Sequence, residues 1–227
     1  DEVDLGDVAV LPGLVNAHTH LELSWMRGRI PETNDFPGWL RSLIALSRGV
    51  CPSTSEASHA VTEAVEECRA CGTAGVGDVS NSLETSDALV AAGMAAVVFH
   101  ELIEFRSADA NRIIGESTAR LQRRPTSPDV QHTLAPHAPY SVSPALFDAI
   151  RRYLQDTPLA RSSVHLGESR AETEFLRSGT GPWRELLEDL GTWDPAWAVP
   201  ACSPVDYIDR NGASGTITNN QQSVGRP

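Results

Sequence analysis

The chain has 227 residues, of which 41% are hydrophobic, a proportion typical of a soluble protein with a buried core. It carries 18 Lys and Arg against 30 Asp and Glu, so its formal net charge is -12. A surface this acidic repels phosphate groups, which argues against nucleic acid and anionic membranes as partners. No apolar run approaches the roughly 20 residues that a membrane-spanning helix requires.

The four cysteines are few and irregularly spaced, which favours a reducing compartment over the disulfide framework of a secreted protein. The N-terminal stretch DEVDLGDVAV has neither the basic nor the apolar region of a secretory signal. We therefore expect a cytoplasmic protein. Since the chain does not begin with Met, we also expect it to be a processed or partial product of a longer one.

Short apolar runs alternate with helical patterns along most of the chain. The first run, GLVNAHTH (13–20), predicts a strand, and the loop-rich segment after it contains a short helix in PGWLRSLIALS. A longer helix comes next, because Ser53 and Glu56 have the spacing of a capping box and Gly72 provides a stop.

The remaining elements continue the alternation. In chain order they are the strand TAGVGDVS, the helix SDALVAAG, the strand MAAVVFHEL, the helix DANRIIGESTARL, the strand VQHTLAPH, a helix capped by Ser143, the strand SSVHLGES, and helices opened by Ser169 and Pro182. Strand–helix alternation predicts an α/β protein with a parallel sheet. Five such units suit the start of either a doubly wound sheet or a (β/α)8 barrel.

Histidines come at or near the carboxyl ends of three predicted strands. His18 and His20 are two residues apart in the first strand and therefore share a face. His137 follows the fourth strand, and His165 lies in the fifth. Barrel enzymes build their sites at the carboxyl ends of the strands, so His18, His20 and His165 can converge on one metal ion. Zinc accepts three such nitrogens and keeps a position open for water.

Each of these residues also has an ordinary interpretation. A lone histidine in a strand is usually a hydrogen-bonded or surface residue, and we interpret the remaining ones in that way: His59, His100 and His132. Glu168, three residues beyond His165, is placed to exchange a proton with metal-bound water, but it also suits a helix start beside Ser169. Asp78 is interpreted as structural, and Glu101 and Glu104 as candidate polar contacts.

Three motifs then point to a family. PGLVNAHTHLELS, APHAPYSVSP and HLGESRAETEFL, in this order and spacing, resemble the amidohydrolase superfamily. Within it they are most similar to the cytosolic deaminases and chlorohydrolases that act on nucleosides and other N-heterocycles, and SPVDYIDR is similar to the aminodeoxyfutalosine-deaminase-like members. The resemblance implies a partial TIM-type (β/α)8 barrel of about the first five β/α units. We expect residues 1–10 to be the remnant of an N-terminal β-sandwich, 11–210 the incomplete barrel, and 211–227 an irregular polar tail.

The resemblance also implies roles for individual residues. His18, His20 and His165 match the family's ligands for one divalent ion, zinc ahead of iron. Glu168 matches the acid/base that moves protons between the water and the departing nitrogen, and His137 matches a substrate contact. The implied activity is hydrolytic deamination of a nucleoside or another N-heterocycle, so the expected partner is a small-molecule substrate, and the oligomeric state stays open.

Two further family ligands are not found. The superfamily has a histidine after the sixth strand and an aspartate after the eighth, and no histidine follows Arg210 in this chain. An incomplete barrel leaves strand edges and an apolar face uncovered, so we expect marginal stability, a tendency to aggregate and weak metal affinity.

Three rival interpretations stay open. The first is dechlorination of an N-heterocycle, and the second is a non-catalytic remnant of such an enzyme. The third is a cytidine-deaminase-like zinc site built from His20, Glu22, Cys68 and Cys71. We disfavour it because Glu67 replaces the usual proline and Cys68 lies on the apolar face of a predicted helix.

Overall fold

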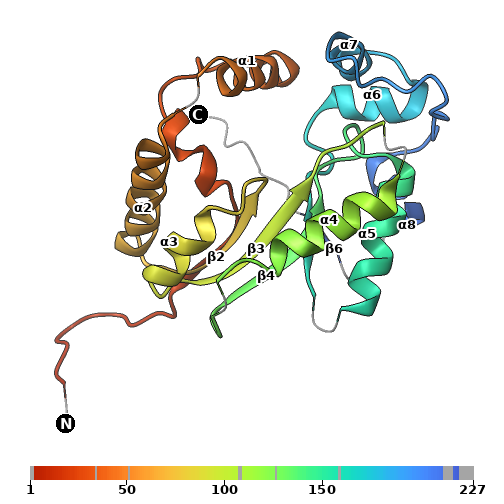
Figure 1. Ribbon diagram of the computed structural model, residues 1–227. Coiled ribbons are helices and arrows are strands. Elements are labelled where there is room, and N and C mark those ends of the chain that lie inside the picture. Colours follow the sequence, from red (N-terminus) through yellow and green to blue (C-terminus); the bar gives the residue numbers. More distant parts are fainter. Residues whose placement is uncertain are drawn as a thin grey trace.

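A parallel sheet of four strands forms the centre of the molecule, in the order β1-β2-β3-β4 (Figure 1). The computed structural model describes residues 3–33, 35–50, 52–106, 109–125, 127–157, 160–211 and 217–219. The four strands are β1 (Leu14–Thr19), β2 (Thr73–Ser80), β3 (Ala95–Leu102) and β4 (Val130–Pro136). Neighbours in the sheet are also neighbours in sequence, as the predicted strand–helix alternation requires.

The pairing of β1 with β2 is less regular than the rest of the sheet. Its register shifts between Leu14 and Val15 and again between Asn16 and Thr19. The backbones approach closely here, since a Cβ on Gly77 would lie 2.3 Å from the carbonyl oxygen of Ala17. A glycine at position 77 therefore allows β1 to reach the place from which its histidines project.

A fifth strand continues the curve beyond β4. β5 (Ser162–Val164) is held against β4 by the Ser162 hydroxyl, which donates to Leu134 O (2.9 Å), and His165 N donates to His137 O (2.8 Å). The strand is shorter than the predicted SSVHLGES, so His165 comes just after it. On its other edge β5 pairs with β6 (Ile217–Asn219).

The polar tail predicted at 211–227 lies mostly outside the residues that the structure describes. Asn211 is the last residue of a helix, and Ile217–Asn219 is a strand instead of the irregular chain that we expected. The reason is that β5 offers an unpaired edge, and backbone pairing needs no particular side-chain pattern.

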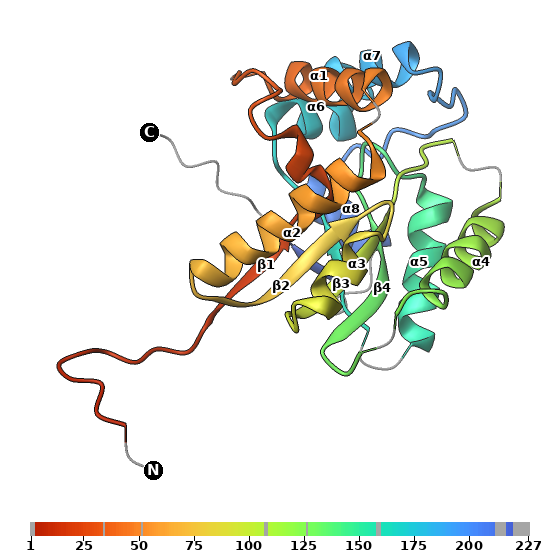
Figure 2. The same cartoon turned by 60° about the vertical axis from the view of Figure 1, so that its left-hand side comes forward.

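Helices connect the strands; some lie along a face of the sheet and others lie beyond its carboxyl end (Figures 1 and 2). They are α1 (Phe36–Gly49), α2 (Thr54–Ala70), α3 (Thr85–Ala91), α4 (Ala110–Leu121), α5 (Pro144–Asp156), α6 (Arg170–Ser178), α7 (Pro182–Asp189) and α8 (Pro204–Asn211), with a 3-10 helix η1 (Leu21–Met26) directly after β1. Only η1 and α8 were not predicted. No helix among the described residues is long and apolar enough to span a membrane.

Three of the helices begin where side-chain caps were predicted. The hydroxyls of Ser53, Ser143 and Ser169 each accept a hydrogen bond from the backbone N–H three residues later, at 3.1–3.2 Å. Such caps are typically worth about 1 kcal/mol each. The cap at Ser169 fixes the start of α6 immediately after Glu168.

The apolar side chains form two main clusters. The larger joins β4 and β5 to helices α5–α8 and includes Leu134, Phe147, Val164 and Trp183. The second joins η1, α2 and α3 to β2 and β3.

β1 differs from the other strands of the sheet in its burial. In a barrel the face of β1 that carries Val15 and Ala17 would pack against helices, but Val15 is 72% exposed. Leu14, which points to the opposite face, is 65% exposed. β1 is an end strand of the four-stranded sheet. The uncovered surface predicted for an incomplete barrel is therefore present.

Candidate metal centre

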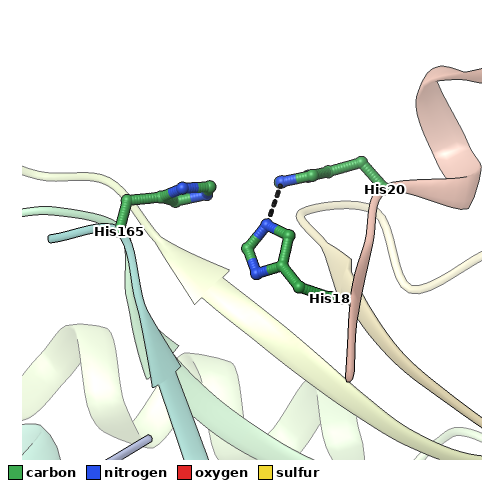
Figure 3. A group of neighbouring side chains, drawn as sticks. All are labelled: His18, His20 and His165. Atoms are coloured by element: carbon green, nitrogen blue, oxygen red, sulfur yellow. Dashed lines mark hydrogen bonds between the residues drawn. The ribbon is translucent and has the colours of Figure 1, made fainter. Parts of the chain in front are cut away.

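Three histidine rings meet at the carboxyl end of the sheet, and Figure 3 shows them turned toward one another. The Nε2 atoms of His18 and His20 lie 3.1 Å apart, and the centroid of the His165 ring lies 4.6 Å and 5.4 Å from those of His18 and His20. Each ring offers a nitrogen within 4.8 Å of the other two. The convergence predicted from the strand pattern is thus present in the fold.

The backbone around the histidine pair is held from two sides. His18 N donates to the Asn16 side chain (3.2 Å), and Leu21 N donates to Asp78 Oδ1 (2.9 Å). The second oxygen of Asp78 accepts from the hydroxyl of Thr85 (2.6 Å). Burial raises the pKa of Asp78 to about 7. This carboxyl group belongs to neither group of candidate ligands among the described residues, so its structural interpretation holds.

Glu22 anchors the chain after His20 to the loop that follows β2. Its carboxylate accepts four hydrogen bonds, from the hydroxyls of Ser80 and Ser82 (both 2.7 Å) and from the backbone N–H groups of Asn81 (2.8 Å) and Ser82 (3.0 Å). A carboxylate engaged in this way has a positioning role. The cytidine-deaminase-like interpretation requires this carboxylate to face an open site, and it does not.

The cysteines of that rival interpretation also lie away from the histidines. Cys68 packs at the edge of the second apolar cluster, and Cys71 is exposed. In the part of the chain that the structure describes, neither belongs to a group with metal-binding spacing. The geometry thus gives the rival no support.

Glu168 holds one side of the His165 ring. Its Oε1 lies 2.8 Å from His165 Nδ1, whereas its Oε2 is buried without a hydrogen bond to any described residue. The backbone N–H of Glu168 donates to Glu172 Oε2 (3.0 Å), which fixes the loop before α6. Because Nδ1 is engaged, the ring presents Nε2 to the common centre.

The protonation states follow from burial and from these contacts. Burial, and then the positive charge of His165, lower the pKa of His18 to about 4. Burial also opposes protonation of His165, but its close contacts with the carboxylates of Glu101 and Glu168 outweigh this effect and raise its pKa to about 10 in the absence of a metal. A cation that binds here must therefore displace the proton of His165.

His137 adds a fourth ring beside the first three. Its centroid lies 5.0 Å from that of His165, and its Nδ1 is hydrogen-bonded to the hydroxyl of Ser141 (2.5 Å). Burial lowers the pKa of His137 to about 4, so the ring is neutral at pH 7. It is thus a buried neutral imidazole next to the three-ring cluster.

Glu101, which the sequence indicated only as a candidate polar contact, lies beside the histidine cluster. It is the last but one residue of β3 and is buried, and its Oε1 lies 3.6 Å from His165 Nε2. With His137 and His165 it forms a second group of candidate ligands. The only sequence signal for Glu101 was its position near a strand end. Glu104 lies only three residues further along, yet among the described residues it belongs to neither group of candidate ligands. The signal therefore does not distinguish the two glutamates.

The other histidines have the ordinary roles that we expected. His100 Nδ1 lies 3.3 Å from Ser80 O, His132 Nε2 lies 2.9 Å from the Ser86 hydroxyl, and His59 pairs with Glu63 at 3.3 Å on an exposed helix face.

The donor set fits a divalent transition metal. Imidazole nitrogens suit zinc and iron, and catalytic zinc sites use three protein ligands with one position left open. His165 has the carboxylate partner at Nδ1 that commonly accompanies a metal-binding histidine. A parallel sheet that gathers three imidazoles and two carboxylates at the ends of its strands defines part of a (β/α) barrel with a candidate metal centre.

The chain belongs to the amidohydrolase family, whose profile matches residues 9–202. An aminodeoxyfutalosine deaminase from Nitratiruptor is 27% identical over 187 residues, which make up 80% of this chain and 44% of that protein. A 5-methylthioadenosine/S-adenosylhomocysteine deaminase from Syntrophobacter fumaroxidans is 29% identical over 219 residues, 91% of this chain and 48% of that protein. The chain thus spans about half the length of the curated relatives it matches.

Solved structures of the same fold confirm the partial barrel. The aminofutalosine deaminase of Helicobacter pylori in complex with methylthio-coformycin superposes with a TM-score of 0.74 at 24% identity, covering 87% of this chain and 47% of that one. A zinc complex of the atrazine chlorohydrolase from Arthrobacter aurescens gives a TM-score of 0.68 at 18% identity, covering 95% and 49%. The doubly wound alternative is therefore excluded.

Proposed function

We propose that this chain carries the metal-binding half of a hydrolase that deaminates a nucleoside or another N-heterocycle. The observation that carries the proposal is the convergence of His18, His20 and His165, with Glu168 2.8 Å from the His165 ring. The relatives named above are deaminases of adenosine-like compounds, and the family is that of amidohydrolases. We place the protein in the cytoplasm because its four cysteines are few and irregularly spaced.

The metal would be held by His18, His20 and His165, with zinc ahead of iron. When bound, a divalent ion lowers the pKa of a coordinated water toward 7 and makes it a nucleophile at neutral pH. The neutral state of His18 favours this role, because an imidazole binds a metal only through an unprotonated nitrogen.

Glu168 would transfer the proton. Burial opposes its ionisation, but the hydrogen bond to His165 outweighs that effect and lowers its pKa, so the carboxylate is ionised at neutral pH. Its Oε2 has no hydrogen-bond partner among the described residues and can accept a proton from the attacking water. The same atom can then donate that proton to the departing nitrogen.

His137 would contact the substrate. It is neutral at pH 7, and its Nδ1 is engaged with Ser141, so Nε2 remains to accept or donate a hydrogen bond to a heterocycle. Its position beside His165 brings such a contact next to the metal position.

Dechlorination is the second candidate, since the chlorohydrolase shares the fold and both reactions add water to an electron-poor ring carbon. Both reactions need a proton taken from the attacking water, but a leaving amine must also receive one, whereas a leaving chloride needs none. The two activities are therefore distinguished by their products, ammonia or chloride.

The test is ammonia release from adenosine, 5-methylthioadenosine and S-adenosylhomocysteine, together with chloride release from atrazine. It compares this chain with a version extended through the segment that its longer relatives possess, and both are assayed with and without Glu168→Gln. We expect ammonia from the extended protein and its loss in the variant. Zinc-loaded extended protein that releases neither ammonia nor chloride would support the non-catalytic interpretation.

A further inference from the structure

Glu172 is a fully buried carboxyl group in the first turn of α6, and the function proposed above does not use it. Burying a carboxyl group is costly unless hydrogen bonds compensate it. Its Oε2 accepts from the backbone N–H of Glu168 (3.0 Å), whereas its Oε1 is buried without a hydrogen bond to any described residue. The side chain of Glu172 is therefore directed to the residue proposed to transfer the proton.

This contact departs from an ordinary capping box. Ser169 and Glu172 have the spacing of such a box, and Glu172 N donates to the Ser169 hydroxyl (3.1 Å). In the standard arrangement the glutamate side chain accepts in return from the backbone N–H of the cap residue. Here it accepts from Glu168, one residue before the cap. Glu172 thus ties α6 to the loop that precedes the helix.

The loop from His165 to Glu168 is anchored at both ends. At its start His165 N donates to His137 O (2.8 Å), which holds the chain to the end of β4. Gly167 then takes a left-handed conformation, with a φ of 71°, which glycine adopts without strain. At the end of the loop, Glu172 holds the N–H of Glu168. The second anchor fixes the point from which the Glu168 side chain projects.

The position of the Glu168 backbone decides what its carboxylate can reach. One oxygen lies 2.8 Å from His165 Nδ1, and the other is the atom proposed to exchange a proton. Both tasks are sensitive to small displacements, since a shift of about 1 Å can cost on the order of 10²-fold in rate. A functional side chain therefore needs support from residues that are themselves held in place, as Glu172 is within α6.

The contact does not require a charge on Glu172. Burial raises the pKa of Glu172 to about 7, so the neutral and the ionised carboxyl group both occur near neutral pH. The carbonyl oxygen of a neutral carboxyl group accepts a hydrogen bond as an ionised one does. Glutamine therefore keeps the contact with the Glu168 N–H. Methionine, which is unbranched and of similar length but has no strong acceptor, removes it.

We propose that Glu172 is a positioning residue, which fixes the backbone of Glu168 from within α6 and so directs its carboxylate to His165 and the metal position. This inference rests on the proposed roles of Glu168 and His165. It gives Glu172 no contact with the metal or the substrate. Any effect of Glu172 on the metal centre must therefore pass through the Glu168 side chain.

The experiment is zinc titration of the 227-residue chain in competition with a chromophoric chelator, with circular dichroism to report the fold. The variants are Glu172→Met and Glu172→Gln. Glu172→Met is also combined with Glu168→Ala, and the double variant is compared with Glu168→Ala alone. The matched control is Glu174→Met, which removes an exposed carboxylate from the same helix.

We expect zinc affinity to fall about tenfold in Glu172→Met, the loss typical of residues that support a metal ligand indirectly. It should stay within threefold of the wild type in Glu172→Gln and in the control. In the Glu168→Ala background, Glu172→Met should cause no further loss. Wild-type affinity of Glu172→Met overturns the inference, and so do equal losses in the two backgrounds or equal losses in Glu172→Met and Glu172→Gln.

If Glu172→Met does not fold, Glu172→Asp decides instead, because its carboxyl group is one methylene shorter and does not reach the Glu168 N–H. The same loss, and its absence in the Glu168→Ala background, are then expected, and wild-type affinity overturns the inference. Zinc binding that does not depend on Glu172 refutes the positioning role alone and leaves the metal centre standing. A wild-type chain that binds no zinc overturns the metal centre and this inference with it.

Discussion

Glu168 Oε1 lies 2.8 Å from His165 Nδ1, and this contact sets the orientation of the imidazole relative to His18 and His20. The contact uses one carboxylate oxygen, and the other is buried and free of hydrogen bonds within the described structure. Glu168 thus combines two roles, since it orients a metal-binding ring with one oxygen and can exchange a proton through the other.

Two substitutions of Glu168 separate these roles. Gln keeps an acceptor for the Nδ1 proton, whereas Ala removes it. We expect zinc affinity to stay within about threefold in Glu168→Gln and to fall by about 10- to 100-fold in Glu168→Ala. Deaminase turnover of the extended protein should fall by about 10²- to 10⁴-fold in both. Equal zinc affinity of the two variants, measured by chelator competition, would contradict the orienting role.

Glu22 offers a test of how the histidine pair is positioned. In Glu22→Gln an amide replaces one carboxylate oxygen, so at least one of the four donors from residues 80–82 faces another donor. We expect a loss of about 1–3 kcal/mol in the free energy of unfolding, measured with urea. Glu32→Gln, on an exposed side chain, serves as the control and should change it by less than about 0.5 kcal/mol.

Asp78 should make stability depend on pH. Its pKa rises from the usual 3.8 to about 7 on folding, so between these values the folded state holds a proton that the unfolded state has lost. The contribution of this carboxyl group to the free energy of unfolding is fully present below about pH 4 and is lost as the pH rises through 7. Asp78→Asn does not titrate, so the stability of the wild type relative to the variant should decrease over this range.

The stability difference between wild type and Asp78→Asn should change with pH by at most about 4 kcal/mol, because each unit of pKa shift corresponds to about 1.4 kcal/mol. Glu172 also titrates near pH 7, but it is present in both proteins and cancels in the comparison. Urea unfolding at pH 4.5, 6 and 8 provides the measurement. A difference between wild type and variant that stays constant with pH would show that the Asp78 carboxyl is ionised throughout.

The exposed edge of β1 should promote self-association. Leu14 and Val15 are largely exposed there, and a free apolar edge invites pairing with another chain. We expect sedimentation analysis to show concentration-dependent oligomers that decrease in Val15→Lys. Val205→Lys, at an isolated exposed valine of α8, is the matched control and should leave the oligomers unchanged. Monomeric wild-type protein at high concentration would refute this expectation.

Local sequence signals predicted much of the fold. Ser53, Ser143 and Ser169 mark helix starts because a cap depends on residues only three positions apart. His18 and His20 could be placed on one face because side chains two apart on a strand point the same way. Their convergence with His165 then followed from the parallel order of the strands.

Other features depend on the assembled fold and have no local signal. Glu101 and Glu104 look alike in sequence, and only the packing of β3 against β4 and the hydrogen bonds from Asn81 bring the first of them to His165. The exposure of Val15 likewise could not be read from its apolar character, because a strand pattern does not say whether a helix covers it. The strand at Ile217–Asn219 arises from the free edge of β5.

The most direct test of the metal centre is X-ray absorption spectroscopy on the zinc-loaded chain. We predict one zinc per chain, bound by nitrogen and oxygen at about 2.0–2.2 Å with the scattering of three imidazole rings, and lost on His165→Ala. Cys68→Ala and Cys71→Ala should leave the spectrum unchanged. A sulfur ligand at about 2.3 Å, or zinc that survives His165→Ala, would contradict a centre built on His18, His20 and His165.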